Sequence, residues 1–121
     1  MGKNILIVDD DKGICDSLSV LLREEGYSVD GITDGLLAKA RIREGNYDLC
    51  IFDYKMKGVT GIELLKMAKE ADPGCPVFII SGVLDIDGIC GKWKKAGIID
   101  GVISKPFDVE ALLKRIAGVI K

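Results

Sequence analysis

Carboxylates follow directly after two strongly apolar segments of the chain. Ile5-Leu6-Ile7-Val8 runs into Asp9-Asp10-Asp11, and Leu49-Cys50-Ile51-Phe52 runs into Asp53. A single aspartate after such a segment usually begins a turn, but the repetition of the pattern favours a shared acidic site. Three carboxylates in one partly buried cleft repel each other, so the pKa of at least one should rise without a compensating cation. Mg²⁺ suits this arrangement because it binds through one or two carboxylates, keeps several waters and pairs with phosphate oxygens.

Two further polar residues stand at the ends of later apolar segments. Ser81 follows Pro76-Val77-Phe78-Ile79-Ile80, and Lys105 follows Gly101-Val102-Ile103-Ser104. The Lys105 ammonium can offset the acidic charge, and the Ser81 hydroxyl and amide can bind a phosphate. A carboxylate is an established nucleophile for forming an aspartyl phosphate, and the transfer needs mainly in-line positioning and charge neutralisation. These residue types predict a phosphoryl-acceptor site centred on Asp53.

The composition leaves few other chemistries open. The 121 residues include 17 lysines and arginines, 19 aspartates and glutamates, and 48% hydrophobic residues, as in an ordinary globular domain. This balance gives no nucleic-acid or membrane-surface footprint, and without a membrane-length apolar run or signal peptide we expect a cytoplasmic protein. The absence of histidine excludes a histidine general base, a Ser-His-Asp triad and a His-containing metal site. We expect reduced thiols, with neither disulfides nor zinc ligands, at Cys15, Cys50, Cys75 and Cys90.

The apolar segments alternate with helical patterns along the whole chain. Strands are predicted at 4–8, 27–33, 48–52, 76–80 and 101–104, each followed by a helix. The fourth helix, within 83–97, contains glycines and is expected to have a loose first turn. Such an alternation predicts one α/β domain over residues 1–121, a doubly wound, flavodoxin-like parallel sheet of five strands flanked by five helices. A strand order of 2-1-3-4-5 would bring Asp9, Asp10 and Asp53 together at the topological switch point.

The sequence as a whole resembles the receiver domains of two-component response regulators, and is similar to the single-domain chemotaxis regulators. The resemblance covers essentially the whole chain, and its motifs occur in the family's order at the predicted strand ends. They are Ile5-Leu6-Ile7-Val8-Asp9-Asp10-Asp11, Asp53 with Met56 and Gly61 at the family spacing, Ile80-Ser81-Gly82, and Lys105-Pro106-Phe107.

The resemblance implies the chemistry of a phosphorylation-dependent signalling switch. Asp53 would be the phosphoacceptor, and Asp10 and the main-chain carbonyl of Lys55 would bind Mg²⁺, with Asp9 acting in the same metal site largely through water. Because this chain lacks histidine, the phosphoryl group would come from another molecule, either a sensor histidine kinase or histidine phosphotransfer protein, or a small phosphodonor. The protein would assist its own phosphorylation and dephosphorylation without turning over a separate substrate, so it is not expected to be an enzyme.

The same resemblance assigns switching roles and exposes departures from the family. Ser81 would be the switch hydroxyl and Lys105 the lysine that contacts the phosphate, with a cis peptide bond before Pro106. The family usually has an aromatic residue where this chain has Val102, and proline where it has Lys57. These departures leave one alternative function open, a pseudo-receiver that binds partners independently of phosphorylation. In either case the target would be an unknown downstream protein or an output domain outside this chain, without direct nucleic-acid or membrane binding.

Overall fold

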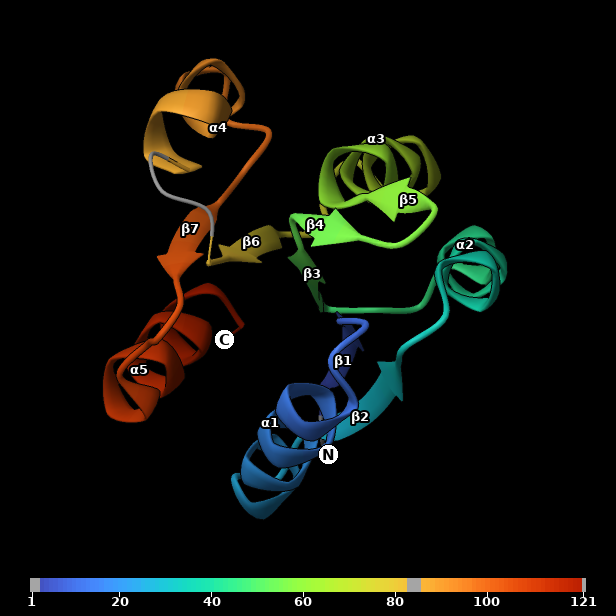
Figure 1. Cartoon of the computed structure of the whole chain (residues 1–121). Coiled ribbons are helices and arrows are strands. Elements are labelled where there is room, and N and C mark those ends of the chain that lie inside the picture. The colour runs from blue at the N-terminus through green and yellow to red at the C-terminus, as the bar shows by residue number, and fades with distance from the viewer. Residues whose placement is uncertain (1–2, 83–85, 121) are drawn as a thin grey trace.

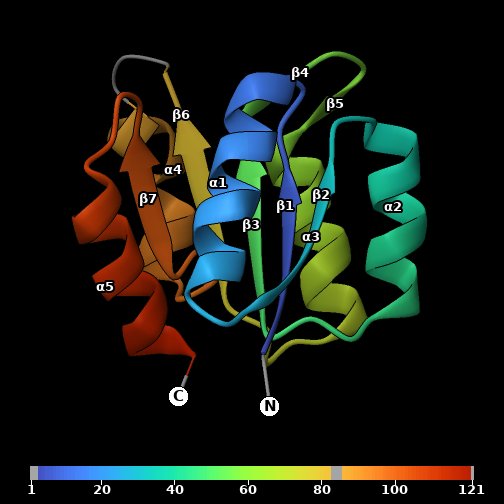
Figure 2. The ribbon, with the colours of Figure 1, turned by 90° about the horizontal axis from the view of Figure 1, so that it is seen from below.

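Five parallel strands form the central sheet of the computed structural model, which describes residues 3–82 and 86–120. Figure 1 looks nearly along the strands of this sheet, and Figure 2 shows the strands side by side with their arrowheads toward one edge. The order β2-β1-β3-β6-β7 is the predicted 2-1-3-4-5 order once the strands are counted as the sequence predicted them. The strands are β1 (Asn4–Val8), β2 (Ser28–Ile32), β3 (Leu49–Asp53), β6 (Val77–Ser81) and β7 (Gly101–Ser104).

Helices cover both faces of this sheet, because the strand side chains point alternately to either side. Ile5 and Ile7 of β1 pack toward α1 and α5, whereas Leu6 and Val8 pack toward α2, α3 and α4. The two resulting apolar clusters are the halves of the core. Among the described residues the helices are α1 (Lys12–Glu24), α2 (Gly35–Glu44), α3 (Gly61–Ala71), α4 (Ile86–Lys95) and α5 (Val109–Val119). None of these helices combines the length and apolarity needed to cross a bilayer.

Capping side chains begin four of the helices. Asp11, Asp34, Thr60 and Asp108 each accept a hydrogen bond from a main-chain N–H of the following turn. The loose first turn expected for α4 falls on residues 83–85, which lie outside the described residues. β2 ends one residue before its predicted end, at Ile32, whereas β3 and β6 each extend one residue beyond theirs, through Asp53 and Ser81. Both site residues are therefore held by sheet pairing.

A two-stranded hairpin between β3 and α3 was not predicted. It consists of β4 (Lys55–Met56) and β5 (Val59–Thr60), joined by a turn in which Gly58 has a φ of +82°. Each strand is too short to show a period-2 pattern in the sequence. The hairpin is held by burial of Met56 and Val59, which oppose each other across it and join the core cluster beneath α2 and α3.

Candidate functional site

The carboxyl edge of the sheet gathers the three aspartates that the sequence singled out. Asp53 is the last residue of β3, and Asp9 and Asp10 follow β1, which pairs directly with β3. One carboxylate oxygen from each of the three lies within 4.8 Å of the others. Asp9 and Asp53 are buried, with 3% and 7% of their surface exposed, whereas Asp10 faces solvent. The predicted convergence at the switch point is thus present in the structure.

Lys105 extends from the end of β7 into this acidic cluster. Its Nζ atom lies 3.0 Å from Oδ2 of Asp9 and 3.4 Å from Oδ1 of Asp53. The main-chain N–H of Lys105 donates to the Ser81 carbonyl at 2.7 Å, and a cis peptide bond joins Lys105 to Pro106. Burial opposes the charge of Lys105, but its bonds to the two carboxylates outweigh that effect and raise its pKa. The lysine is therefore held as a cation between both acids.

The pKa of Asp53 rises, as the crowding of carboxylates predicted. Burial is the largest cause and the charge of Asp9 the next, while Lys105 opposes both; together they raise the pKa of Asp53 to about 6. One ammonium therefore does not fully offset the buried acids. A cation that added positive charge at this place would favour the ionised form of Asp53, which is the form that can act as a nucleophile.

Ser81 and Val102 lie on the two strands beyond β3. Ser81 ends β6, is 1% exposed and pairs in register with Ser104 of β7, so it stands at the same edge of the sheet as Asp53. Val102 is buried at 9% exposure in the core cluster that β7 shares with α4, and Arg115 donates to its carbonyl at 3.1 Å. The position expected to hold a rotating aromatic ring is therefore a small core residue.

One contact at this site escaped the sequence reasoning. The main-chain N–H of Lys57, in the turn of the hairpin, donates to Oδ2 of Asp10 at 3.2 Å. Proline has no N–H, so this contact depends on the departure from the family pattern at residue 57. The only signal in the sequence is Gly58, a residue type that is common in turns because it adopts positive φ without steric cost. Lys55, whose carbonyl is the expected fourth metal ligand, belongs to the same hairpin.

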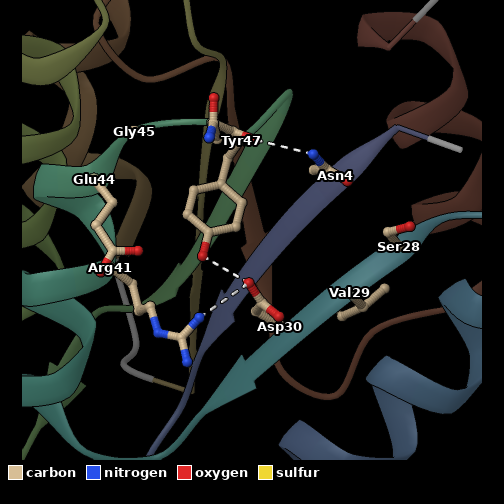
Figure 3. A pocket seen from close by; sticks show the side chains of 9 residues that line it. Asn4, Ser28, Val29, Asp30, Arg41, Glu44, Gly45 and Tyr47 are labelled. Carbon is tan, nitrogen blue, oxygen red and sulfur yellow. Dashed lines mark hydrogen bonds and ion pairs between the residues drawn. The ribbon is translucent and has the colours of Figure 1, made fainter.

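The pocket in Figure 3 lies at the amino-terminal end of the sheet, away from the acidic cluster and near the start of β1 and β2. There the Tyr47 hydroxyl donates to Oδ2 of Asp30 at 2.7 Å, and Arg41 lies 3.8 Å from the same oxygen. Burial and the bond to Asp30 raise the pKa of Tyr47. These side chains connect α2 and the segment before β3 to the edge strand, and none of the predicted site residues lies among them.

The doubly wound sheet, with its acids and lysine at the carboxyl edge, defines the class of α/β proteins that place their chemistry at a switch point. A family model described as the response regulator receiver domain matches residues 5–117. The chain therefore belongs to the receiver-domain family of two-component response regulators.

Solved structures and curated relatives agree with this assignment. A CheY-like receiver domain protein from Methanospirillum hungatei is 31% identical, with a TM-score of 0.89 over 99% of this chain and 94% of that one. TrrA of Thermotoga maritima, solved in complex with Mg²⁺ and BeF, is 27% identical, with a TM-score of 0.85 over 97% and 98%. The DNA-binding response regulator MtrA of Mycobacterium tuberculosis is 33% identical; the match covers all of this chain but 52% of MtrA. ZraR of Klebsiella oxytoca is 38% identical, and the match covers 90% of this chain and 24% of ZraR. The chain therefore spans about half the length of MtrA and about a quarter of the length of ZraR.

Proposed function

We propose that this chain is a phosphorylation-dependent switch in which Asp53 accepts a phosphoryl group from the phosphohistidine of a sensor histidine kinase or histidine phosphotransfer protein. The observation that carries the proposal is the placement of Lys105, 3.0 Å from Asp9 and 3.4 Å from Asp53, within the acidic cluster. A lysine paired to two buried acids beside a third is an arrangement suited to a phosphoryl group with its metal ion. A surface turn residue or a helix cap would require none of these contacts.

Mg²⁺ is the cation that this donor set fits. Hard oxygen donors suit it, and here three carboxylates offer oxygens within 4.8 Å of one another, one of them on the solvent-exposed Asp10. When bound, the ion would neutralise charge on the transferring phosphoryl oxygens. The residues that would hold it are Asp9, largely through water, Asp10, Asp53 and the main-chain carbonyl of Lys55.

The transfer itself forms one bond and breaks another. A carboxylate oxygen of Asp53 attacks phosphorus, the bond from phosphorus to the donor imidazole nitrogen breaks, and its electron pair returns to the imidazole. Lys105 stays between Asp9 and the new phosphate, where its ammonium offsets the added negative charge. Ser81, on the neighbouring strand end, supplies the hydroxyl that binds the phosphate. Phosphorylation gives Asp53 a group with a charge of about −1.5 to −2, which is larger than the charge of its carboxylate. This added negative charge repositions the donors on Lys105 and Ser81.

The signal would leave the domain through its surface. Relatives that are about twice as long or longer support a downstream target that is either an output domain or a separate protein. On this proposal the receiver turns over no separate substrate, binds no nucleic acid or membrane directly, and works in the cytoplasm.

The test is phosphorylation of the purified chain by a small phosphodonor. Protein incubated with Mg²⁺ and acetyl phosphate or phosphoramidate should gain the mass of one phosphoryl group, and Asp53→Ala should abolish the gain. Glu70→Gln is a matched control, because Glu70 is an exposed carboxylate on α3 outside the site. An unchanged mass, under conditions that phosphorylate another receiver domain, would rule out the proposal.

A phosphorylation-independent pseudo-receiver is the second candidate, and the burial of Val102 favours it. Val102 cannot rotate as an aromatic ring would, and it is 9% exposed in the core. The two candidates differ in the response of α4, β7 and α5 to phosphate. If the chain gains a phosphoryl group and the amide resonances of those elements do not move, the pseudo-receiver is the better description.

A further inference from the structure

Two cysteines approach each other at the end of the sheet away from Asp53. Cys50 is the second residue of β3, and Cys75 lies two residues before the start of β6, the strand that pairs with β3. Their Sγ atoms are 3.8 Å apart, and the side chains are buried, with 3% and 5% of each residue exposed. Neither thiol takes part in the phosphoryl-acceptor site.

We propose that Cys50 and Cys75 form a redox-modification site, in which a small two-electron oxidant such as hydrogen peroxide converts the two thiols to a disulfide. The sulfurs are in contact already, and bond formation requires them to close from 3.8 Å to about 2.05 Å. Both thiols lie on adjacent, hydrogen-bonded segments, since the N–H of Cys50 donates to the carbonyl of Pro76 at 3.0 Å. The pair is thus held together by the sheet.

The surroundings assign different roles to the two sulfurs. The hydrogen bond between the thiols lowers the pKa of Cys75, and the ammonium of Lys69, which donates to the Cys75 carbonyl at 2.7 Å, acts in the same direction. The bond to Cys75 and burial raise the pKa of Cys50. The ammonium of Lys69 beside the Cys75 main chain favours Cys75 as the attacking thiolate, with Cys50 as the thiol that completes the reaction.

The reaction balances in two steps. The Cys75 thiolate attacks one oxygen of hydrogen peroxide, the O–O bond breaks, and the released hydroxide takes up a proton to leave as water. The sulfur of Cys50 then attacks the sulfenic acid of Cys75, its thiol proton goes to the departing hydroxyl, and a second water leaves. Two thiols and one peroxide give one disulfide and two waters, so no further reductant or oxidant is required.

A small cleft lies against the pair. The cleft is lined by both cysteines together with residues of α2 and α3, and its volume is about 10 Å³, on the order of one water molecule. This size favours peroxide over bulky disulfides such as oxidised glutathione. The cross-link would close a loop from residue 50 to residue 75 that contains Asp53, the β4–β5 hairpin and α3.

The chain contains two matched control cysteines. Cys15 and Cys90 are buried at 1% and 0% exposure, and burial raises the pKa of Cys15. Reduced protein is treated with hydrogen peroxide, denatured, and alkylated before intact mass measurement and peptide mapping. We expect loss of two hydrogen atoms, alkylation of Cys15 and Cys90, and one cross-linked peptide that joins Cys50 to Cys75.

Three single-cysteine substitutions test which thiols form the cross-link. Cys75→Ala and Cys50→Ala should each abolish the cross-link, whereas Cys15→Ala should retain it. Wild-type mapping alone decides the question should either variant fold poorly. Oxidation confined to sulfinic acids, or cross-links that include Cys15 or Cys90 as often as Cys50 and Cys75, would overturn the proposal. The measurement contains no phosphodonor, so its outcome is independent of whether Asp53 accepts phosphate.

Discussion

Replacing Asp53 with asparagine should stabilise the metal-free protein at neutral pH. The side chain is 7% exposed, and burial and Asp9 raise its pKa from 3.8 to about 6. Asparagine matches the protonated acid in shape and has no charge to bury. The variant therefore lacks the unfavourable free energy of ionising Asp53 in its buried site. At 1.36 kcal/mol per pH unit, the raised pKa corresponds to about 3 kcal/mol in the free energy of unfolding.

The pH dependence gives the sign of the effect. Between pH 3.8 and about 6 the folded protein binds a proton at Asp53 that the unfolded chain has released, so wild-type stability falls as the pH rises through this window. The advantage of Asp53→Asn should therefore be absent near pH 3.8, develop up to pH 6, and remain constant above it. Saturating Mg²⁺ should reduce the advantage, because the ion compensates the carboxylates that asparagine no longer contributes.

Urea denaturation followed by circular dichroism, in the presence of EDTA, measures this difference at each pH. Glu70→Gln serves as the control, because Glu70 is an exposed carboxylate outside the cluster, and its effect should stay within about 0.5 kcal/mol at every pH. The reasoning is refuted if Asp53→Asn is no more stable than wild type above pH 6. A gain of equal size at pH 4 and pH 7 would refute it as well, since a neutral carboxyl cannot repel Asp9.

Two further substitutions test the hairpin and its packing. Lys57→Pro removes the N–H that orients Asp10 and should weaken Mg²⁺ binding by up to about tenfold in an NMR titration. The control Lys57→Ala keeps this N–H donor and should bind Mg²⁺ as the wild type does. Equal Mg²⁺ affinities of the two variants would contradict the positioning role of the N–H. Gly61→Ala should lower the free energy of unfolding by about 1–3 kcal/mol, because the added Cβ would lie 2.6 Å from the main-chain oxygen of Asp53. The Cβ that Gly91→Ala adds in α4 would have no neighbour within 4 Å outside the helix's own backbone. This substitution should instead raise the free energy of unfolding by about 0.5–1 kcal/mol in the same urea assay.

Most of the sheet could be predicted because its signals are local. Apolar runs that end in a polar residue mark four of the strands, and the helical pattern after each run marks the helix that follows. In β2, Val29 and Ile32 are the buried residues. The strand ends at Asp53 and Ser81 were placed one residue short, because a polar residue at the end of an apolar run looks like a turn until the sheet pairs it.

The hairpin could not be predicted, and its reason is tertiary. Lys55–Met56 and Val59–Thr60 are too short for any period to appear, and they pair because Met56 and Val59 are buried against elements distant in sequence. The contact of Lys57 with Asp10 exists only through that hairpin, and it joins positions 47 residues apart. The approach of Cys50 to Cys75 likewise depends on the pairing of β3 with β6.

The sequence by itself determined which groups could perform the chemistry: carboxylates, a lysine and a serine at strand ends, in a chain without histidine. Residue types and local periodicity depend on the chain alone, so these groups can be identified without knowledge of the fold. Only the tertiary structure decided how strongly the groups interact. The distances from Lys105 to Asp9 and Asp53 and the burial that raises the Asp53 pKa arise where β1, β3 and β7 end together. Charge interactions depend on separation and solvent exposure, and both are properties of the folded chain.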